Sequence, residues 1–345
     1  MFRATAAVRR PHPAGPAALP RLVRAAGYSP PARSAPYRPG DAREEFYDEL
    51  GAPYRASFDR ARFAAAGRHT SVELAYGALE ALGPLDAGDA PELAVVAYAA
   101  PDFEHTELVA SCLRRRLPGG PLAFALSDQG RLAPFSALRV AVEYARRCGW
   151  TRLLLLVVDQ GTQPFPLPAG PSPAEVEVAG DAAVALLLRW DGGDRPLGGQ
   201  AQGRPGAGLF AQWPADAALA AGAGLADCGE LPPHHGPLTE GPTGRPATGS
   251  WTALLDAAAH GDAPTVHADR AHATTAHADG AHATTAHADG AHATTAHADG
   301  AHATTAHATG AGSGPVDRPV VVADYDRERD ALAYCTLHTG ELRPR

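Results

Sequence analysis

Leu153-Leu154-Leu155-Leu156-Val157-Val158 is an unbroken apolar run that follows shortly after Trp150. A strand that is covered on both faces carries such a run, so we predict a fully buried strand here. A helix over about 134–148 precedes it, with apolar residues on one face and arginines in its last turn. The helix and the run together indicate one unit of an α/β fold.

The same alternation of helix and strand extends in both directions from this run. Upstream we expect a helix that begins at the capping box of Thr70 and Glu73, a strand at 93–99, a helix at about 105–117 and a strand at 122–126. Downstream, a second buried strand covers 182–188. This alternation predicts βαβ units and a layered α/β fold.

The pattern is looser toward both ends of the chain. Residues 1–40 are rich in Pro, Arg and Ala without periodicity, which predicts an irregular arm. After residue 191 we expect five elements: a short strand near 208–213, an Ala-rich helix near 215–223, a helix near 250–260, and a closing strand pair at 319–323 and 332–337. Asp324, Tyr325 and Asp326 read as the turn within that pair.

Composition excludes several classes of protein. The 345 residues include no Lys, no Asn and no Ile, and all 30 basic residues are Arg. Without Lys there is no Schiff-base chemistry, no P-loop Lys and no kinase Lys. Without Asn there is no N-glycosylation acceptor and no Cys–His–Asn catalytic set. The net charge of −8 and a pI near 6.0 argue against nucleic acid as a partner.

The cysteines and the apolar segments indicate the compartment. Cys112, Cys148, Cys228 and Cys335 are far apart and form no CxxC pair, which is typical of reduced thiols and not of a metal cluster. Prolines interrupt the N-terminal segment, and no run approaches the ~18 apolar residues of a membrane helix. We therefore expect a soluble, cytoplasmic protein that does not bind a membrane and holds no metal.

A low-complexity insertion occupies residues 265–313. Nine histidines recur every five residues from His267 to His307, in alternating His-Ala-Asp-Gly-Ala and His-Ala-Thr-Thr-Ala units. Five matches neither the helical nor the strand period, and Ala is the only apolar residue, so little surface can be buried against the entropy of ordering. We interpret it as a disordered insertion; the alternative is a His-rich tract that captures metal or responds to pH.

Residues 70–188 resemble the N-terminal half of the thiolase-like fold, specifically ketosynthase III (β-ketoacyl-acyl-carrier-protein synthase III). Six markers occur in register: Thr70-Ser71-Val72-Glu73-Leu74-Ala75, Leu93–Ala97 with Ala100-Pro101-Asp102-Phe103, Leu122–Leu126, Phe135-Ser136-Ala137-Leu138, Leu153–Val158 and Gly180-Asp181-Ala182-Ala183. The resemblance implies two related βαβ halves, at 41–190 and 191–345. The second half is shortened and carries the insertion; Gly241-Pro242-Thr243-Gly244 is its clearest marker.

The chain departs from this family at the reactive positions. The family carries a nucleophilic Cys at the turn between strand and helix, seven residues before the Leu that corresponds to Leu138, and this count reaches Arg131. Arg is always protonated and cannot act as a nucleophile. The family's His and Asn partners come from the C-terminal half, where Asn is absent and His234 or His235 could supply the His. The resemblance thus implies the fold without its usual condensing chemistry.

Other side chains near this turn keep alternatives open. Ser127 or Ser136 could be a nucleophile if His234 or His235 were the base and Asp128 its orienting carboxylate. No GxSxG motif supports this, and serines on the surface or in a helix are the simpler interpretation. Gly130 and Arg131 could hold an anionic ligand at the helix N-terminus.

Arg114, Arg115 and Arg116 end a predicted helix, where the helix dipole accounts for them. The alternative is that they meet an acidic acyl carrier protein or the phosphates of CoA.

We therefore expect a ketosynthase III-like protein of bacterial secondary metabolism that binds acyl thioesters of CoA or an acyl carrier protein. One interpretation is a catalytically silent subunit that pairs with a ketosynthase-like subunit. The others are a divergent acyltransferase with a nucleophile other than Cys, and a stand-alone binding protein with a metal-capturing His tract. No resident cofactor is expected. The resemblance implies a homodimer or heterodimer formed through the strand at 122–126.

Overall fold

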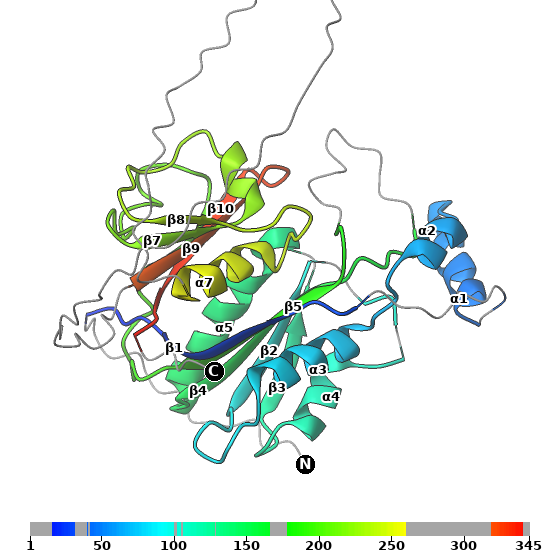
Figure 1. Cartoon of the computed structure of the whole chain (residues 1–345), viewed down its shortest axis with the longest axis horizontal. Helices are drawn as coiled ribbons and strands as arrows, with labels where there is room; N and C mark the ends of the chain where they lie inside the picture. The colour runs from blue at the N-terminus through cyan, green and yellow to red at the C-terminus, as the bar shows by residue number, and fades with distance from the viewer. Residues whose placement is uncertain are drawn as a thin grey trace, which may run out of the picture. The chain divides into compact units, whose positions relative to one another are not determined.

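The apolar run lies in strand β4 (Arg152–Asp159), third from one edge of a mixed sheet (Figure 1). We describe residues 16–31, 40, 42–99, 102–104, 106–127, 129–165, 178–259 and 319–340 of a computed structural model. β4 pairs in parallel with β2 (Leu93–Tyr98) and antiparallel with β5 (Ala182–Arg189). Every residue of β4 after Arg152 is buried, which confirms the prediction of a strand covered on both faces.

Five strands make up the N-terminal half, in the order β3-β2-β4-β5-β1. Alternate residues of β4 enter two buried clusters. Leu154, Leu156 and Val158 pack with the helices α3 (Ser71–Leu82) and α4 (Val109–Arg116). Leu153, Leu155 and Val157 pack with α5 (Ala133–Cys148) on the other face. Thr70 and Glu73 form the expected capping box of α3.

The C-terminal half repeats this topology with shorter elements. Its strands follow the order β8-β7-β9-β10-β6, and they are β6 (Gln200–Gly203), β7 (Ala218–Ala221), β8 (Leu238–Glu240), β9 (Pro319–Asp326) and β10 (Ala331–His338). The two parallel and two antiparallel pairings match those of the first half in sequence order. The chain thus consists of two related halves in one layered α/β fold.

The helices show where the second half is shortened. α7 (Gly249–Ala259) occupies the place that α5 has in the first half, and Phe135 of α5 lies 5.4 Å from Trp251 of α7 between ring centroids. In the first half α3 lies between β1 and β2. The corresponding segment of the second half, residues 204–217 between β6 and β7, contains no helix. Loop side chains such as Trp213 cover the outer face of that sheet instead.

Three sequence predictions need correction. Within the expected arm, Arg21–Tyr28 forms strand β1, which pairs with β5 and touches β10. Leu22, Val23 and Ala26 of this strand are buried. The intervening Arg24 interrupts the apolar pattern, and its guanidinium contacts the Leu82 carbonyl and Asp89. The expected helix near 215–223 is β7 followed by a short 3-10 helix, η3 (Ala223–Asp227), and the expected strand near 208–213 is a turn. Residues 1–15 and the repeat at 265–313 lie outside the described residues.

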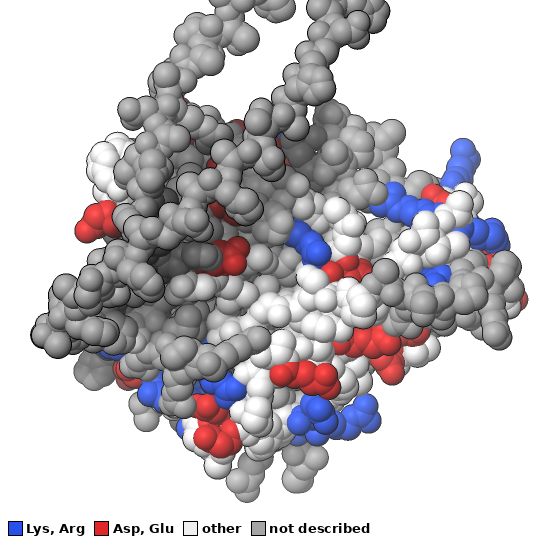
Figure 2. All heavy atoms as spheres, in the orientation of Figure 1, with Lys and Arg blue, Asp and Glu red and all other residues white. Residues whose placement is uncertain are grey.

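A small helical lobe projects from the first half between β1 and α3 (Figure 1). It consists of α1 (Ala42–Gly51), the 3-10 helix η1 (Ala52–Tyr54) and α2 (Arg60–Ala65). No helix among the described residues is long and apolar enough to cross a membrane. On the face that Figure 2 shows, acidic and basic side chains are interspersed.

Candidate functional site

The turn between β3 (Leu122–Leu126) and α5 positions Arg131 at the contact between the two halves. The 3-10 helix η2 (Gly130–Leu132) leads directly into α5 and carries Arg131. The Arg131 guanidinium Nη1 lies 3.4 Å from Oδ1 of Asp324 on β9. The two residues are only 9% and 1% exposed, so a charged pair from opposite halves is buried at this turn.

Asp324 is held in an environment that disfavours its charge. Burial raises the pKa of its carboxyl group to about 7, although the Arg131 guanidinium and the backbone N–H of Tyr325 favour the ionised form. Its Oδ2 atom is buried and has no hydrogen-bond partner among the described residues. The carboxyl group therefore exchanges its proton near neutral pH and depends on Arg131 when it is ionised.

The loop after β7 closes over this pair with two glycines. A Cβ at Gly222 would lie 2.1 Å from Asp324 Oδ2, and a Cβ at Gly224 would lie 2.3 Å from Arg131 Nη1. Real side chains do not approach this closely, so neither position admits one while the ion pair is in place. Three segments from two halves thus fill the space around the turn.

Comparison with solved structures identifies this architecture. The structure of 3-oxoacyl-(acyl carrier protein) synthase III from Pseudomonas aeruginosa PAO1 matches 95% of this chain and 100% of its own, with a TM-score of 0.51 and 16% identity. A second 3-oxoacyl-(acyl-carrier-protein) synthase III matches 92% of this chain and 99% of its own, with a TM-score of 0.50 and 14% identity. The chain has the ketosynthase III fold.

A third structure, described as the acyltransferase ChlB3, is 19% identical, and the match spans 57% of this chain and 60% of that one with a TM-score of 0.35. No family model matches the chain, and no curated protein matches it by sequence. At these identities the comparisons show the thiolase-like fold of ketosynthase III and leave activity, substrate and partners to be argued from the residues.

Two aspartates of β9 lie near Gly130 and Arg131, at the turn where the resemblance places a nucleophile. Gly130 has a φ of +52°, and a Cβ there would lie 3.1 Å from Asp326 Oδ2. Asp324 and Asp326 both come from β9, so the sequence interpretation of this pair as a turn was wrong; the turn follows at 327–330. Two carboxylates of β9 thus lie near Gly130 and Arg131, the residues predicted to hold an anionic ligand.

The structure places Ser136 and His234, two members of the proposed Ser, His and Asp set, far from hydrogen-bonding one another. Ser136 is buried on α5, with its Oγ 2.5 Å from Gln129 Oε1 and 3.1 Å from Gln202 Oε1. His234 lies in the loop before β8, with its ring 6.5 Å from that of Trp213, and burial lowers its pKa. Trp213 packs with Val321 and Ala323 of β9, whereas α5 packs with Val320 and Val322. Ser136 and His234 thus lie on opposite faces of the second half's sheet.

The remaining candidates are Ser127, Asp128 and His235. Ser127 is half-buried directly after β3, and Asp128 lies outside the described residues. His235 is exposed, and only its backbone N–H is engaged, with the Ala215 carbonyl. Among the described residues, no group of three or more His, Cys, Asp or Glu could hold a metal ion.

The arginines of α4 lie toward the opposite end of β3 from Arg131. α4 ends at Arg116 shortly before β3 begins, whereas the turn with Arg131 follows the end of β3. The Arg116 guanidinium lies 5.7 Å from the Tyr76 ring centroid and 4.0 Å from Glu80. These contacts agree with the helix-terminus interpretation, and contact with an acyl carrier protein or the phosphates of CoA stays a prediction.

Asp159 of the first half holds the start of α7 in the second half through hydrogen bonds. It is the last residue of β4, as Asp326 is of β9. Its carboxylate accepts hydrogen bonds from the backbone N–H groups of Ala247 (3.0 Å) and Thr248 (2.7 Å) and from the Thr248 hydroxyl (2.7 Å). Each half therefore places a carboxylate from its fourth strand near the start of the other half's central helix.

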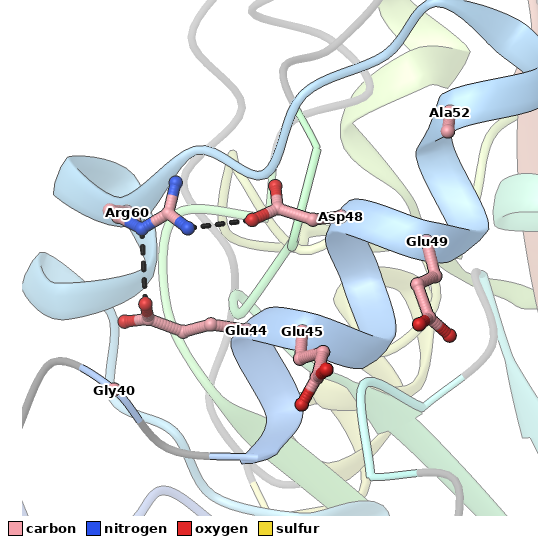
Figure 3. Close-up of a pocket in the computed structure, with 7 residues that line it drawn as sticks. All are labelled: Gly40, Glu44, Glu45, Asp48, Glu49, Ala52 and Arg60. Carbon is pink, nitrogen blue, oxygen red and sulfur yellow. Dashed lines mark hydrogen bonds and ion pairs between the residues drawn. The ribbon is translucent and has the colours of Figure 1, made fainter.

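The pocket in Figure 3 lies on the α1–α2 lobe and is unsuited to the phosphates of CoA. Its charged lining consists of Glu44, Glu45, Asp48, Glu49 and Arg60. Arg60 is already paired with Glu44 at 3.1 Å and Asp48 at 2.7 Å, and these bonds raise its pKa. Four carboxylates around one neutralised cation repel an anionic ligand.

Sequence reasoning missed His69 and the role of Asp181. The His69 Nδ1 atom lies 2.7 Å from Asp181 Oδ2, and Asp181 Oδ1 accepts a hydrogen bond of 2.7 Å from the Gly161 N–H. Asp181 belongs to the Gly-Asp marker, which was the only signal available. In this chain Asp181 of the marker has a structural role, because it connects the start of β5 to the segment before α3.

Substitution of Gly222 tests how tightly the loop closes over the ion pair. We expect Gly222→Ala to lower the free energy of unfolding by about 1–3 kcal/mol, because the new methyl group overpacks against Asp324. Gly229→Ala is the matched control, since no atom lies within 4 Å of a Cβ at that position. Urea denaturation measures both; equal stability of the two variants would contradict the packing described here.

Proposed function

We propose that this chain binds acyl thioesters, carried by CoA or by an acyl carrier protein, and does not form a covalent acyl intermediate. The observation that supports the proposal is the buried Arg131–Asp324 pair at the turn where the resemblance places a nucleophile. Covalent transfer at this turn needs a thiol or hydroxyl group there, and Arg131 provides neither. The ketosynthase III fold supports the class of ligand.

Within this proposal the chain acts as a non-catalytic subunit of a dimer. β3 is an edge strand, because it pairs only with β2 in the described sheet. Leu122 is 44% exposed on it, and Tyr144 of α5 lies next to Phe124, with a ring separation of 5.6 Å. An uncharged, apolar edge strand is a template for pairing with another chain. A second copy or a ketosynthase-like subunit would cover it.

Binding tests the first part of the proposal. Calorimetric titration with acetyl-CoA and with an acetylated acyl carrier protein should give saturable binding to at least one of them. Titration with CoA alone and with the unacylated carrier protein shows whether the acyl group contributes. Absence of binding in all four titrations would remove the proposed ligand class.

Substitution at the sheet edges tests the second part. We expect Leu122→Glu to convert a dimer into a monomer in size-exclusion chromatography with light scattering, because it places a charge within the apolar edge. Leu238→Glu is the matched control: Leu238 is 46% exposed on β8, the edge strand of the other half. A strictly monomeric parent protein, or a dimer that Leu238→Glu disrupts and Leu122→Glu does not, would refute pairing through β3.

A further inference from the structure

The α1–α2 lobe has an aromatic core of its own. Tyr47, Phe58 and Phe63 are buried with Phe103, and this cluster is distinct from the three clusters that pack against the sheet. The Tyr47 and Phe58 rings stack at 5.7 Å, and Phe63 meets Phe103 edge to face at 5.5 Å. Phe103 comes from the loop after β2, so the lobe rests on loops at the carboxyl end of the parallel strands.

Two hydrogen bonds join the lobe to loops of the first half within the part of the chain that the structure describes. The Tyr47 hydroxyl donates to the Phe103 carbonyl, and the Asp59 N–H donates to the Pro164 carbonyl at 2.8 Å. Both acceptors lie in loops. A region with a small core of its own opens at a lower free energy than the sheet does.

The segment that joins the lobe to α3, residues 66–70, is fixed much more firmly. The Arg68 N–H donates to Thr162 Oγ1 at 2.9 Å, and the next residue, His69, contacts Asp181 at 2.7 Å. The His69 and Asp181 side chains are 13% and 3% exposed. The His69 carbonyl also accepts a bond of 2.8 Å from the Gln160 amide. Arg68 and His69 are therefore hydrogen-bonded to the segment that follows β4 and to the segment that precedes β5.

The backbone of this segment is strained. Arg68 has a φ of +54°, a conformation that is unfavourable for a residue with a side chain and that persists only when its surroundings impose it. A Cβ at Gly67 would lie 2.2 Å from Asp181 Oδ2, so only glycine lets the carboxylate reach His69. The contact between His69 and Asp181 and the left-handed turn beside it thus depend on each other.

We infer that His69 and Asp181 form a latch that holds the α1–α2 lobe closed over the carboxyl ends of β2 and β4. When the contact breaks, Arg68 relaxes and the lobe, residues 42–65, opens as a unit about residues 66–68. α3 is unaffected, because it has its own capping box and its Ser71 N–H is held by Asp102 at 2.7 Å. Opening exposes Phe103 and the loops on which the lobe rests.

Hydrogen–deuterium exchange with peptide resolution tests the latch on the full chain. We expect His69→Leu to accelerate exchange of the α1 and α2 amides about tenfold, because the substitution removes one charge-assisted hydrogen bond. The amides of β4 and α3 should exchange as in the parent. His69→Asn should restore most of the protection, because its amide N–H can take the place of the ring Nδ1–H. His235→Leu, at an exposed histidine, is the control and should change nothing.

A second variant keeps the test decisive if His69→Leu fails to fold. Thr162→Val preserves shape but removes the acceptor of the Arg68 N–H, and we expect it to accelerate exchange in the lobe about threefold. Unchanged exchange in the lobe with either folded variant would overturn the inference. Equal acceleration in α1, α2, α3 and β4 would overturn it as well, because the lobe would then open only together with the core.

Discussion

Arg131→Met should lower the free energy of unfolding by about 2 kcal/mol more at pH 8.5 than at pH 5, because without its cation the buried Asp324 carboxyl group must stay protonated above its pKa in the parent, about 7. At pH 5 the loss should be small. There the carboxyl group is protonated, since its pKa is about 7. Urea denaturation followed by tryptophan fluorescence at the two pH values measures the difference.

Two controls separate the buried pair from a general effect of removing an arginine. The double variant Arg131→Met/Asp324→Leu removes both charges and should regain most of the stability that the single variant loses, as apolar replacements of buried ion pairs do. Arg204→Met breaks an exposed ion pair with Asp330 and should leave stability near that of the parent. Similar losses in Arg131→Met and Arg204→Met would show that the Arg131–Asp324 contact is not energetically significant.

Stability of the parent chain should fall as the pH rises from about 4 to about 7. The pKa of Asp324 is raised from 3.8 to about 7 in the folded chain, so between these values the folded state binds a proton that the unfolded chain has released. Each increase of one pH unit in this window therefore lowers the free energy of unfolding. The full shift of the Asp324 pKa corresponds to about 4 kcal/mol. Above pH 7 this contribution is constant, and below pH 4 its full stabilisation is present.

Asp324→Asn isolates this contribution from all other titrating groups. The amide is a neutral substitute for the protonated carboxyl group, so the variant should lack the decline between pH 4 and pH 7. Stability of parent and variant is measured by urea denaturation at half-unit intervals of pH. Parallel curves across the whole range would show that Asp324 titrates in the folded chain as it does in the unfolded one.

Local patterns predict much of the N-terminal half. The run at 153–158 has no polar residue to place at a surface, and the Thr70 and Glu73 capping box depends only on residues three apart. β1 was missed for an equally local reason: Arg24 interrupts its apolar pattern, and its guanidinium finds acceptors some sixty residues away. A single sequence contains no sign that such a side chain is satisfied at a distance.

The candidate site was predictable only in part. Counting from Leu138 identifies Arg131 as the residue at the turn, but its partner Asp324 is 193 positions distant and in the other half of the fold. The sequence predicts a turn at Asp324, because carboxylates such as Asp324 and Asp326 beside Tyr325 are typical of turns. Its place inside β9 becomes understandable once Arg131 and the two glycines around it are known.

Intact mass spectrometry of the full chain after incubation with acetyl-CoA tests most directly whether a covalent acyl intermediate forms. We predict an unchanged mass at pH 7 and at pH 8.5, together with binding in the titrations described above. An increase by one acetyl group, mapped by peptide sequencing to Ser127, Ser136 or any cysteine, would contradict the account. It would identify the chain as a divergent acyltransferase with a nucleophile other than the one that the ketosynthase III fold leads us to expect.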